Sequence, residues 1–408
     1  MTATLPAGRL GPDFHRLWIA SAVSNLGDGV TLVAAPLLVA SLNPDPAAVA
    51  AAALAPQLPW LLLSLLSGAL VDRLDRRRLI IAVNIGRALV LAALAGAVLA
   101  GTATVPLVCL AFFLTGVGET LADTAAGALL PSVVPADRLE QANSRLSATF
   151  MIGNQFVAKP LGAYLFVGAA ALPFGFDAAT FGTAALLLAL LRWRPVPSAT
   201  TPAPPVARRS LRADVAEGVR ALWAVPVLRT LAGCIAVMNV AFCAAFAAFV
   251  LYARQRLGLA EVGYGLLLTA SALGGLAGST LATRLRFRFG TPALLRAGLL
   301  IEIALQLVLA GTRHPLVAGA ALAVWGVHAM VWGVLVVSLR QRLVPDRLRG
   351  RVNSVYALAD LGGAALGTVT GGVLARATGS ILAPFWLAAA TLTVLTALVW
   401  RRLGDTGR

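Results

Sequence analysis

Long apolar stretches separated by short polar turns make up almost the whole chain. About twelve stretches of roughly 20 residues can be marked, each long enough to cross a hydrocarbon core of about 30 Å. They begin near residues 15, 47, 79, 105, 142 and 172, and then near residues 227, 263, 292, 315, 352 and 380. Because lipid offers the backbone no hydrogen-bond partners, each stretch is expected to be a helix. The pattern predicts an all-α integral membrane protein with twelve transmembrane helices.

Several landmarks between and within these stretches recur at a fixed offset of 210 residues. The sequence Val134-Pro135 matches Val344-Pro345, and Asn143-Ser144 matches Asn353-Ser354. Glycines keep the same offset in the pairs Gly68 and Gly278, Gly153 and Gly363, and Gly162 and Gly372. Since each half contains an even number of crossings, the halves enter the membrane in the same direction. We therefore expect two parallel-repeat six-helix bundles around a central cavity, with the substrate bound between them.

A proline-rich polar stretch divides the two halves. Residues 195–209 contain five prolines and read as a linker. After it, apolar residues recur at helical spacing from Leu211 to Trp223, which predicts a short amphipathic helix on the cytoplasmic surface. The expected domains are an N-terminal bundle over residues 1–194, a linker with this helix over residues 195–224, and a C-terminal bundle over residues 225–408.

Composition and charge agree with a location in lipid. The chain is 59% hydrophobic and 12% charged, with a mean hydropathy of +0.84, whereas a soluble domain carries roughly 25% charged residues. The net charge of +16 comes from arginines concentrated in the termini and the even-numbered connections. This bias predicts that both termini are cytoplasmic. Scattered arginines without stacking aromatic residues do not indicate nucleic-acid binding.

Motifs for metal, cofactor or nucleotide chemistry are not found in the sequence. The three cysteines lie in apolar stretches without metal-ligand spacing. The only lysine, Lys159, is followed by proline, so the chain lacks the loop that cradles ATP phosphates. His15, His314 and His328 are too far apart in sequence or depth to form a catalytic set. We expect no cofactor, no metal and no enzymatic activity.

Ionisable groups near the middle of apolar stretches each require a reason, because a charge there costs about 2.5–3.5 kcal/mol. Asp28 lies near the centre of the first stretch, one turn beyond Asn25, and Glu119 near the centre of the fourth. We interpret Asp28 and Glu119 as candidate proton-coupling residues, although either could be permanently paired. Lys159 could pair with such an acid, contact an anionic cargo, or have a structural role.

Polar and aromatic groups in the second half give further candidates. Asn239 lies near the centre of the seventh stretch and His328 near the centre of the tenth. His328 could carry a proton or form a hydrogen bond between helices. Trp325 and Trp332 could stack on an aromatic cargo or face lipid. Weaker candidates are Glu302 and Asp360, while Asp177 reads as a helix cap and Arg87 and Arg296 read as side chains that snorkel to the surface.

The run Gly68-Ala69-Leu70-Val71-Asp72-Arg73-Leu74-Asp75-Arg76-Arg77-Arg78 resembles the signature turn of the major facilitator superfamily. With Asp75 at a position usually held by glycine, it is similar to the branch of enterobactin-exporter-like and macrolide-efflux-like proteins. Further stretches similar to that branch include residues 24–29, 59–62, 176–181 and 344–354. The resemblance implies that the first, fourth, seventh and tenth helices line the central cavity.

The resemblance also implies a charge latch that holds the outward-open state. Its members here would be Gly68, Asp72, Arg76 and Asp123. The alternative is that the arginines of this turn only orient the protein, and we favour that interpretation for Arg77 and Arg78. An antiporter-type signature on the fifth helix is incomplete, because Ala158-Lys159-Pro160 replaces its usual Gly-Pro arrangement.

Together these observations predict a secondary active transporter in a bacterial cytoplasmic membrane. We expect a monomer that exports lipophilic or amphipathic small molecules, such as a drug, a siderophore or a secondary metabolite, against protons by alternating access. The alternative is an importer or facilitative exchanger of a small metabolite. More remote alternatives are an intramembrane enzyme and a non-transporting sensor.

Overall fold

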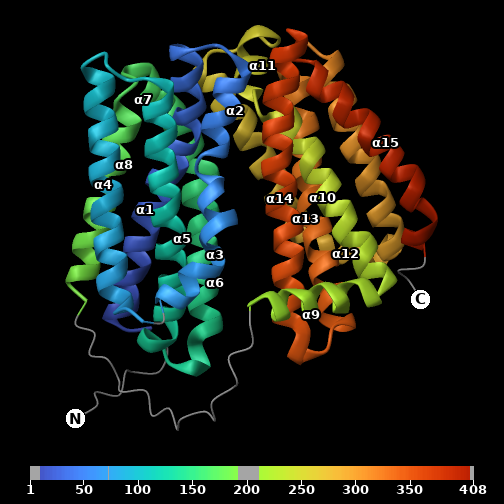
Figure 1. Cartoon of the computed structure of the whole chain (residues 1–408), viewed down its shortest axis with the longest axis horizontal. Coiled ribbons are helices and arrows are strands. Elements are labelled where there is room, and N and C mark those ends of the chain that lie inside the picture. The colour runs from blue at the N-terminus through green and yellow to red at the C-terminus, as the bar shows by residue number, and fades with distance from the viewer. Residues whose placement is uncertain (1–9, 72, 192–210, 405–408) are drawn as a thin grey trace. The chain divides into compact units, whose positions relative to one another are not determined.

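The computed structural model of the chain describes residues 10–71, 73–191 and 211–404, and every regular element in these ranges is helical (Figure 1). The chain separates into two compact units. Unit 1 comprises residues up to 44 and residues 55–199, and unit 2 comprises Asp45–Leu54 and the chain from residue 200 onward.

Unit 1 consists of long helices and one interrupted helix. Its elements are α1 (Pro12–Leu42), α3 (Gln57–Val71), α4 (Arg76–Leu99), α5 (Val105–Val133), η1 (Ala136–Arg138), α6 (Leu139–Phe150), η2 (Met151–Val157), α7 (Ala158–Gly168) and α8 (Leu172–Ala189). Prolines stand in the first turn of α1, α5 and α8, where no intrahelical N–H bond is lost. Asp75 caps α4 by accepting a bond of 2.9 Å from the backbone N–H of Arg78.

Unit 2 consists of α2 (Pro46–Leu54), α9 (Leu211–Ala224), α10 (Pro226–Phe246), α11 (Phe249–Gln255), α12 (Glu261–Gly311), α13 (Pro315–Leu343), α14 (Asp346–Thr378) and α15 (Ala383–Gly404). Two successive helices make up α12. They meet at Gly290, which has a φ of 76° that only glycine adopts without strain, and Pro292 follows. This break coincides with the sequence-predicted turn between two apolar stretches.

The predicted all-α membrane fold is confirmed. Among the described residues, nine helices are long and apolar enough to cross a membrane, and α2 with α3 would make a tenth as one broken span. The double helix α12 covers two of the predicted stretches, and α6, η2 and α7 together cover the stretch that begins near residue 142. The total of twelve spans remains a prediction.

The two units differ from the expected domains in the assignment of α2. We expected residues 1–194 to form one bundle, but α2 packs on α14 within unit 2, where Gly372 leaves room for Ala50. Asp45 and Arg376 add an ion pair of 3.4 Å. Small side chains are the reason for this packing, because they let two helix backbones approach closely.

The predicted amphipathic helix after the linker is α9, which packs mainly on α14 in unit 2 (Figure 1). Gly218 lies against the backbone of Arg351, and the Arg351 guanidinium pairs with Glu217 at 2.8 Å. Leu222 is fully buried, while Trp223 is exposed. The proline-rich stretch before α9 lies outside the described residues.

Candidate functional site

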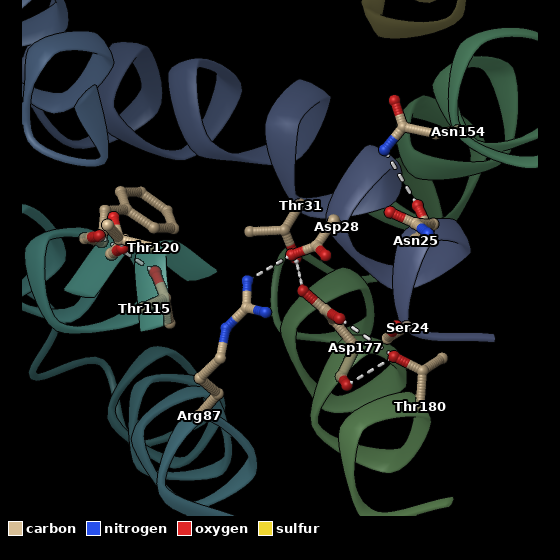
Figure 2. Close-up of polar contacts among 12 residues, drawn as sticks. Ser24, Asn25, Asp28, Thr31, Arg87, Thr115, Thr120, Asn154, Asp177 and Thr180 are labelled. Atoms are coloured by element: carbon tan, nitrogen blue, oxygen red, sulfur yellow. Dashed lines mark hydrogen bonds and ion pairs between the residues drawn. The ribbon is translucent and has the colours of Figure 1, made fainter. Parts of the chain in front are cut away.

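The polar interior of unit 1 centres on an ion pair between two membrane-spanning helices. Nη2 of Arg87 on α4 donates to Oδ1 of Asp28 on α1 at 2.6 Å. The Arg87 side chain is 6% exposed and the Asp28 side chain 23%. Figure 2 shows Arg87 reaching toward Asp28, with Asp177 and Thr180 of α8 beside the pair. Such a pair keeps two charges in a weakly hydrated region only because each neutralises the other.

Packing fixes the position of the Arg87 guanidinium. It lies 3.9 Å from the ring centroid of Phe181 on α8, a cation–π arrangement. Its aliphatic part runs along Gly118 of α5, where a Cβ would stand 2.7 Å from Cγ and Cδ of Arg87. The prediction that Arg87 snorkels to the surface is therefore wrong, because a buried partner and a glycine groove hold it inside the unit. By contrast, Arg296 binds the carbonyl of Trp400.

Asp177 belongs to the same polar cluster. Its carboxylate accepts a bond of 2.6 Å from Oγ1 of Thr31 and one of 3.0 Å from Oγ1 of Thr180, and the residue is 1% exposed. The close approach of α8 to α1 depends on Gly27, whose backbone lies against Asp177. The interpretation of Asp177 as a helix cap is wrong, since α8 begins five residues earlier at Leu172.

Two more carboxyl groups on α5 lie within electrostatic range of this cluster. Glu119 interacts with Asp28, Arg87 and Asp123. Asp123 follows Glu119 by one helical turn, and its side chain is exposed. Four carboxyl groups thus surround the guanidinium of Arg87, namely those of Asp28, Asp177, Glu119 and Asp123. Because the acids outnumber this cation, bound protons are a natural means of neutralising the remaining charge.

A second polar chain in unit 1 contains Lys159, which is 8% exposed. Its Nζ donates to Oε1 of Gln155 at 2.7 Å, and Nε2 of Gln155 donates to Oδ1 of Asn154 at 2.9 Å. Asn154 in turn donates to the backbone carbonyl of Asn25 at 2.9 Å. Within the described ranges Lys159 forms no ion pair with a carboxylate. This geometry does not support pairing with an acid and leaves the contact with an anionic cargo as a proposal.

Asn154 and Gln155 lie on a π-helix, η2, between α6 and α7, and Lys159 lies in the first turn of α7. A π turn is rare and is often found at functional sites. It presents Asn154 to α1, where a Cβ at Gly29 would stand 2.8 Å from the Asn154 carbonyl. Farther along, a Cβ at Gly162 would stand 2.5 Å from the carbonyl of Val30. Only the glycines indicate this close contact at the level of sequence.

The latch between Asp72, Arg76 and Asp123 stays a prediction. Asp72 and the surroundings of Gly68 lie outside the described residues. Arg76 donates to the carbonyl of Ala128 on α5 at 2.9 Å, and Asp123 lies earlier on the same helix. Arg77, expected only to orient the protein, donates to the carbonyl of Leu188 at 3.0 Å and so caps the end of α8.

In unit 2, Asn239 of α10 and Asp360 of α14 form a short hydrogen bond through Nδ2 of Asn239. Asn239 is a cavity candidate predicted from the sequence and Asp360 a weaker one, and nothing in the sequence indicates that they pair. The guanidinium of Arg340 on α13 lies 4.0 Å from the ring centroid of Tyr356. Tyr356 precedes Asp360 by one turn of α14. These residues form a polar contact among three helices that the sequence could not pair.

The candidates on α13 make different contacts. His328 and Trp332 are buried against Gly298 of α12, and their rings meet edge to face at a centroid distance of 5.8 Å. Trp325 stacks on Phe242 of α10 at 4.2 Å with an interplanar angle of 8°. The stack continues from Phe242 to Phe246 and Phe249. Trp325 therefore packs on protein aromatic rings, and its indole N–H donates to Glu302 at 2.8 Å.

Sequence comparisons place the chain among membrane transporters. The sequence profile of the family described as transmembrane secretion effector matches residues 10–405. The chain is 28% identical over 372 residues to the multidrug efflux pump Tap of Mycolicibacterium fortuitum, covering 88% of each protein. It is also 35% identical over 136 residues to an uncharacterized MFS-type transporter of Mycobacterium tuberculosis, covering 33% of this chain and 31% of that protein.

Solved structures show the same fold. A bacterial homologue of the iron transporter ferroportin in its inward-facing state has a TM-score of 0.73 at 18% identity, covering 97% of this chain and 99% of the other. The nucleoside transporter NupG has a TM-score of 0.75 at 12% identity, covering 96% and 99%. Taken with the match over residues 10–405, these similarities show that the chain is a multi-pass membrane transporter and belongs to the transmembrane secretion effector family of the major facilitator superfamily.

Proposed function

We propose that this protein exports lipophilic or amphipathic small molecules in exchange for protons, and that Asp28 carries the coupled proton. The observation that carries the proposal is the ion pair of 2.6 Å between Asp28 and Arg87 within membrane-spanning helices. Protonation of Asp28 removes the charge that neutralises Arg87. The strength of the contact between α1 and α4 therefore depends on whether the proton is bound, which gives a protonation event a structural effect.

Neighbouring acids extend this proton-binding capacity. Asp177 and Glu119 interact electrostatically with both Asp28 and Arg87. When Asp28 is protonated, Arg87 can turn to another of these carboxylates, so that a positive charge is never left alone in the membrane. A proton entering the cluster is thus shared among coupled groups, as in other carboxyl clusters.

The energetics of one proton are sufficient for export. A proton that moves down a potential of 100 mV releases about 2.3 kcal/mol. Since a tenfold gradient costs about 1.4 kcal/mol, one proton can support a substrate gradient of a few tens-fold. The direction of transport and the class of substrate rest on the similarity to the multidrug efflux pump of Mycolicibacterium fortuitum.

The test uses everted membrane vesicles from cells that express the protein, with a panel of fluorescent lipophilic dyes, ethidium among them. Acidification of the lumen should drive dye accumulation, and an uncoupler should abolish it. Asp28→Asn is expected to remove the accumulation while the protein remains folded. The matched control is Glu140→Gln, which neutralises an exposed acid on α6. Accumulation that persists with the uncoupler would contradict proton coupling.

We further propose that both termini are cytoplasmic, in a bacterial inner membrane. The support is the concentration of arginines in the termini and even-numbered connections. Cysteines introduced at Arg78 and Arg288 should be labelled by an impermeant maleimide from the same side of the membrane. Labelling from opposite sides would exclude the parallel repeat.

A further inference from the structure

A buried carboxyl group and a buried imidazole face each other in unit 2. Oε1 of Glu302 on α12 lies 3.3 Å from Nε2 of His328 on α13, and the two side chains are 4% and 3% exposed. Gly298, one turn before Glu302, makes room for the imidazole, because a side chain there would overlap the ring. Trp325 donates to the same Oε1 atom at 2.8 Å.

Several polar atoms around this pair have unused hydrogen-bonding capacity. Within the part of the chain that the structure describes, Oε2 of Glu302, Nε2 of His328 and both side-chain polar atoms of Gln306 lack a hydrogen bond. Gln306 follows Glu302 by one turn and is fully buried. Buried polar atoms nearly always have partners, so a group of four on two packed helices calls for a physical explanation.

The charged and titratable groups around the pair leave Glu302 with one basic neighbour. Cys243 of α10 is close enough to interact with both Glu302 and Asp360. Asp360 of α14 accepts from Asn239, and Arg340 stacks on Tyr356. Arg296, on the same helix as Glu302, lies over Trp400 of α15. Among the described residues, His328 is the only basic side chain within ion-pair distance of Glu302.

We propose that Glu302 and His328 together bind one proton and form a proton site in unit 2. With one proton the pair is neutral overall, either as a carboxylate beside an imidazolium or as a carboxylic acid beside a neutral ring. Without it, a carboxylate would stand in a dry site next to a neutral ring, which is unfavourable.

The bound proton is linked to an aromatic surface. Trp325 donates to Glu302 and stacks on Phe242 of α10, so Glu302 sets the orientation of the indole ring. Loss or gain of the proton changes how strongly Oε1 of Glu302 accepts a hydrogen bond. It therefore changes the strength of the hydrogen bond from Trp325. Glu302 is thus a positioning residue for the stack formed by Trp325, Phe242, Phe246 and Phe249.

The composition of the chain makes this site accessible to spectroscopy, since it contains three histidines and five glutamates. The full-length protein in lipid nanodiscs would carry His15→Gln and His314→Gln, so that ¹⁵N-labelled histidine reports His328 alone. Infrared spectra with ¹³C-labelled glutamate would report the Glu302 carboxyl group, assigned by its loss in Glu302→Gln. At neutral pH we expect one proton on the pair, seen either as an imidazolium signal or as a protonated carboxyl band.

A neutral imidazole beside an ionised Glu302 carboxylate at neutral pH would overturn the proposal. Glu302→Gln should also change the His328 signal, whereas Glu140→Gln should leave it unaltered; an unaltered signal in Glu302→Gln would count against the pair. If Glu302→Gln fails to fold, the loss of the imidazole signal in His328→Gln assigns that signal. The spectra of the labelled protein with an intact Glu302–His328 pair then show whether the pair holds a proton. Asp28→Asn should leave both signals in place, which separates this result from the test of proton-coupled export.

Discussion

Asp28 on α1 and Arg87 on α4 form an ion pair of 2.6 Å between two membrane-spanning helices. The pair joins helices that are far apart in sequence, and the ring of Phe181 covers the guanidinium. It is both a structural link and the proposed place of proton uptake. Its strength can therefore be measured separately from transport.

A double-mutant cycle measures that strength. Breaking a buried pair by removing one partner costs up to about 3–5 kcal/mol, because the other charge remains buried. Arg87→Met should therefore lower the free energy of unfolding strongly, and adding Asp28→Asn should restore part of the loss. Equilibrium unfolding in mixed detergent micelles should give a coupling energy of roughly 0.5–3 kcal/mol. Strictly additive losses would mean that the pair does not stabilise the fold.

Gly118 allows a second, purely steric test of how Arg87 is positioned. A Cβ at this position would stand 2.7 Å from Cγ and Cδ of Arg87, so Gly118→Ala should displace the guanidinium from Asp28. We expect lower thermal stability and slower dye export. Gly127→Ala on the same helix is the matched control, since nothing lies within 4 Å of its added methyl group. Equal effects of the two substitutions would argue against the groove as the cause.

Lys159 has no carboxylate partner among the described residues, which predicts that the effect of replacing it depends on the charge of the exported substrate. Its described partner is the neutral Gln155, at 2.7 Å. If Lys159 contacts anionic substrates, Lys159→Met should reduce export of anionic dyes several-fold more than export of neutral or cationic dyes. Lys159→Arg keeps the charge and should retain part of the anion transport. A uniform loss across all dyes would instead indicate a structural role for the lysine.

The proposed latch predicts different roles for neighbouring arginines. Arg76 donates to the carbonyl of Ala128, whereas the side chain of Arg78 is exposed. Arg76→Gln should lower the maximal rate of export with little change in the dye concentration at half-maximal rate, because it affects a conformational step. Arg78→Gln should leave the rate within about twofold of the parent protein. Comparable loss in both variants would show that the basic turn acts only through its total charge.

The fold was largely predictable because a membrane protein has few options for its backbone. Apolar length and the placement of arginines identified the membrane helices, and a turn predicted near residue 290 coincides with the break at Gly290. The assignment of α2 was less predictable. Its packing on α14 depends on the contact between Ala50 and Gly372, and alanine and glycine occur throughout these helices.

The site was predictable only in part. Asp28 was found because a carboxylate in an apolar stretch is costly, but its partner Arg87 was assigned to the surface. Depth along a helix can be read from sequence, whereas the face that a side chain occupies depends on the packing of distant helices. The same limit explains why Asp177 was taken for a cap and why Glu302, on a helix expected to be peripheral, was ranked below His328.

The π-helix at Met151–Val157 has a consequence for the residues that follow it. Its wide turn holds one residue more than an α turn, and an α-helix advances by about 100° per residue. The extra residue is taken up within the turn, so deleting one residue here should restore an α turn and leave α7 facing the same way. Gly162 would stay against Val30, whereas the same deletion in a regular α turn would rotate every following residue by roughly 100°. The wide turn thus absorbs one residue without turning α7 away from α1.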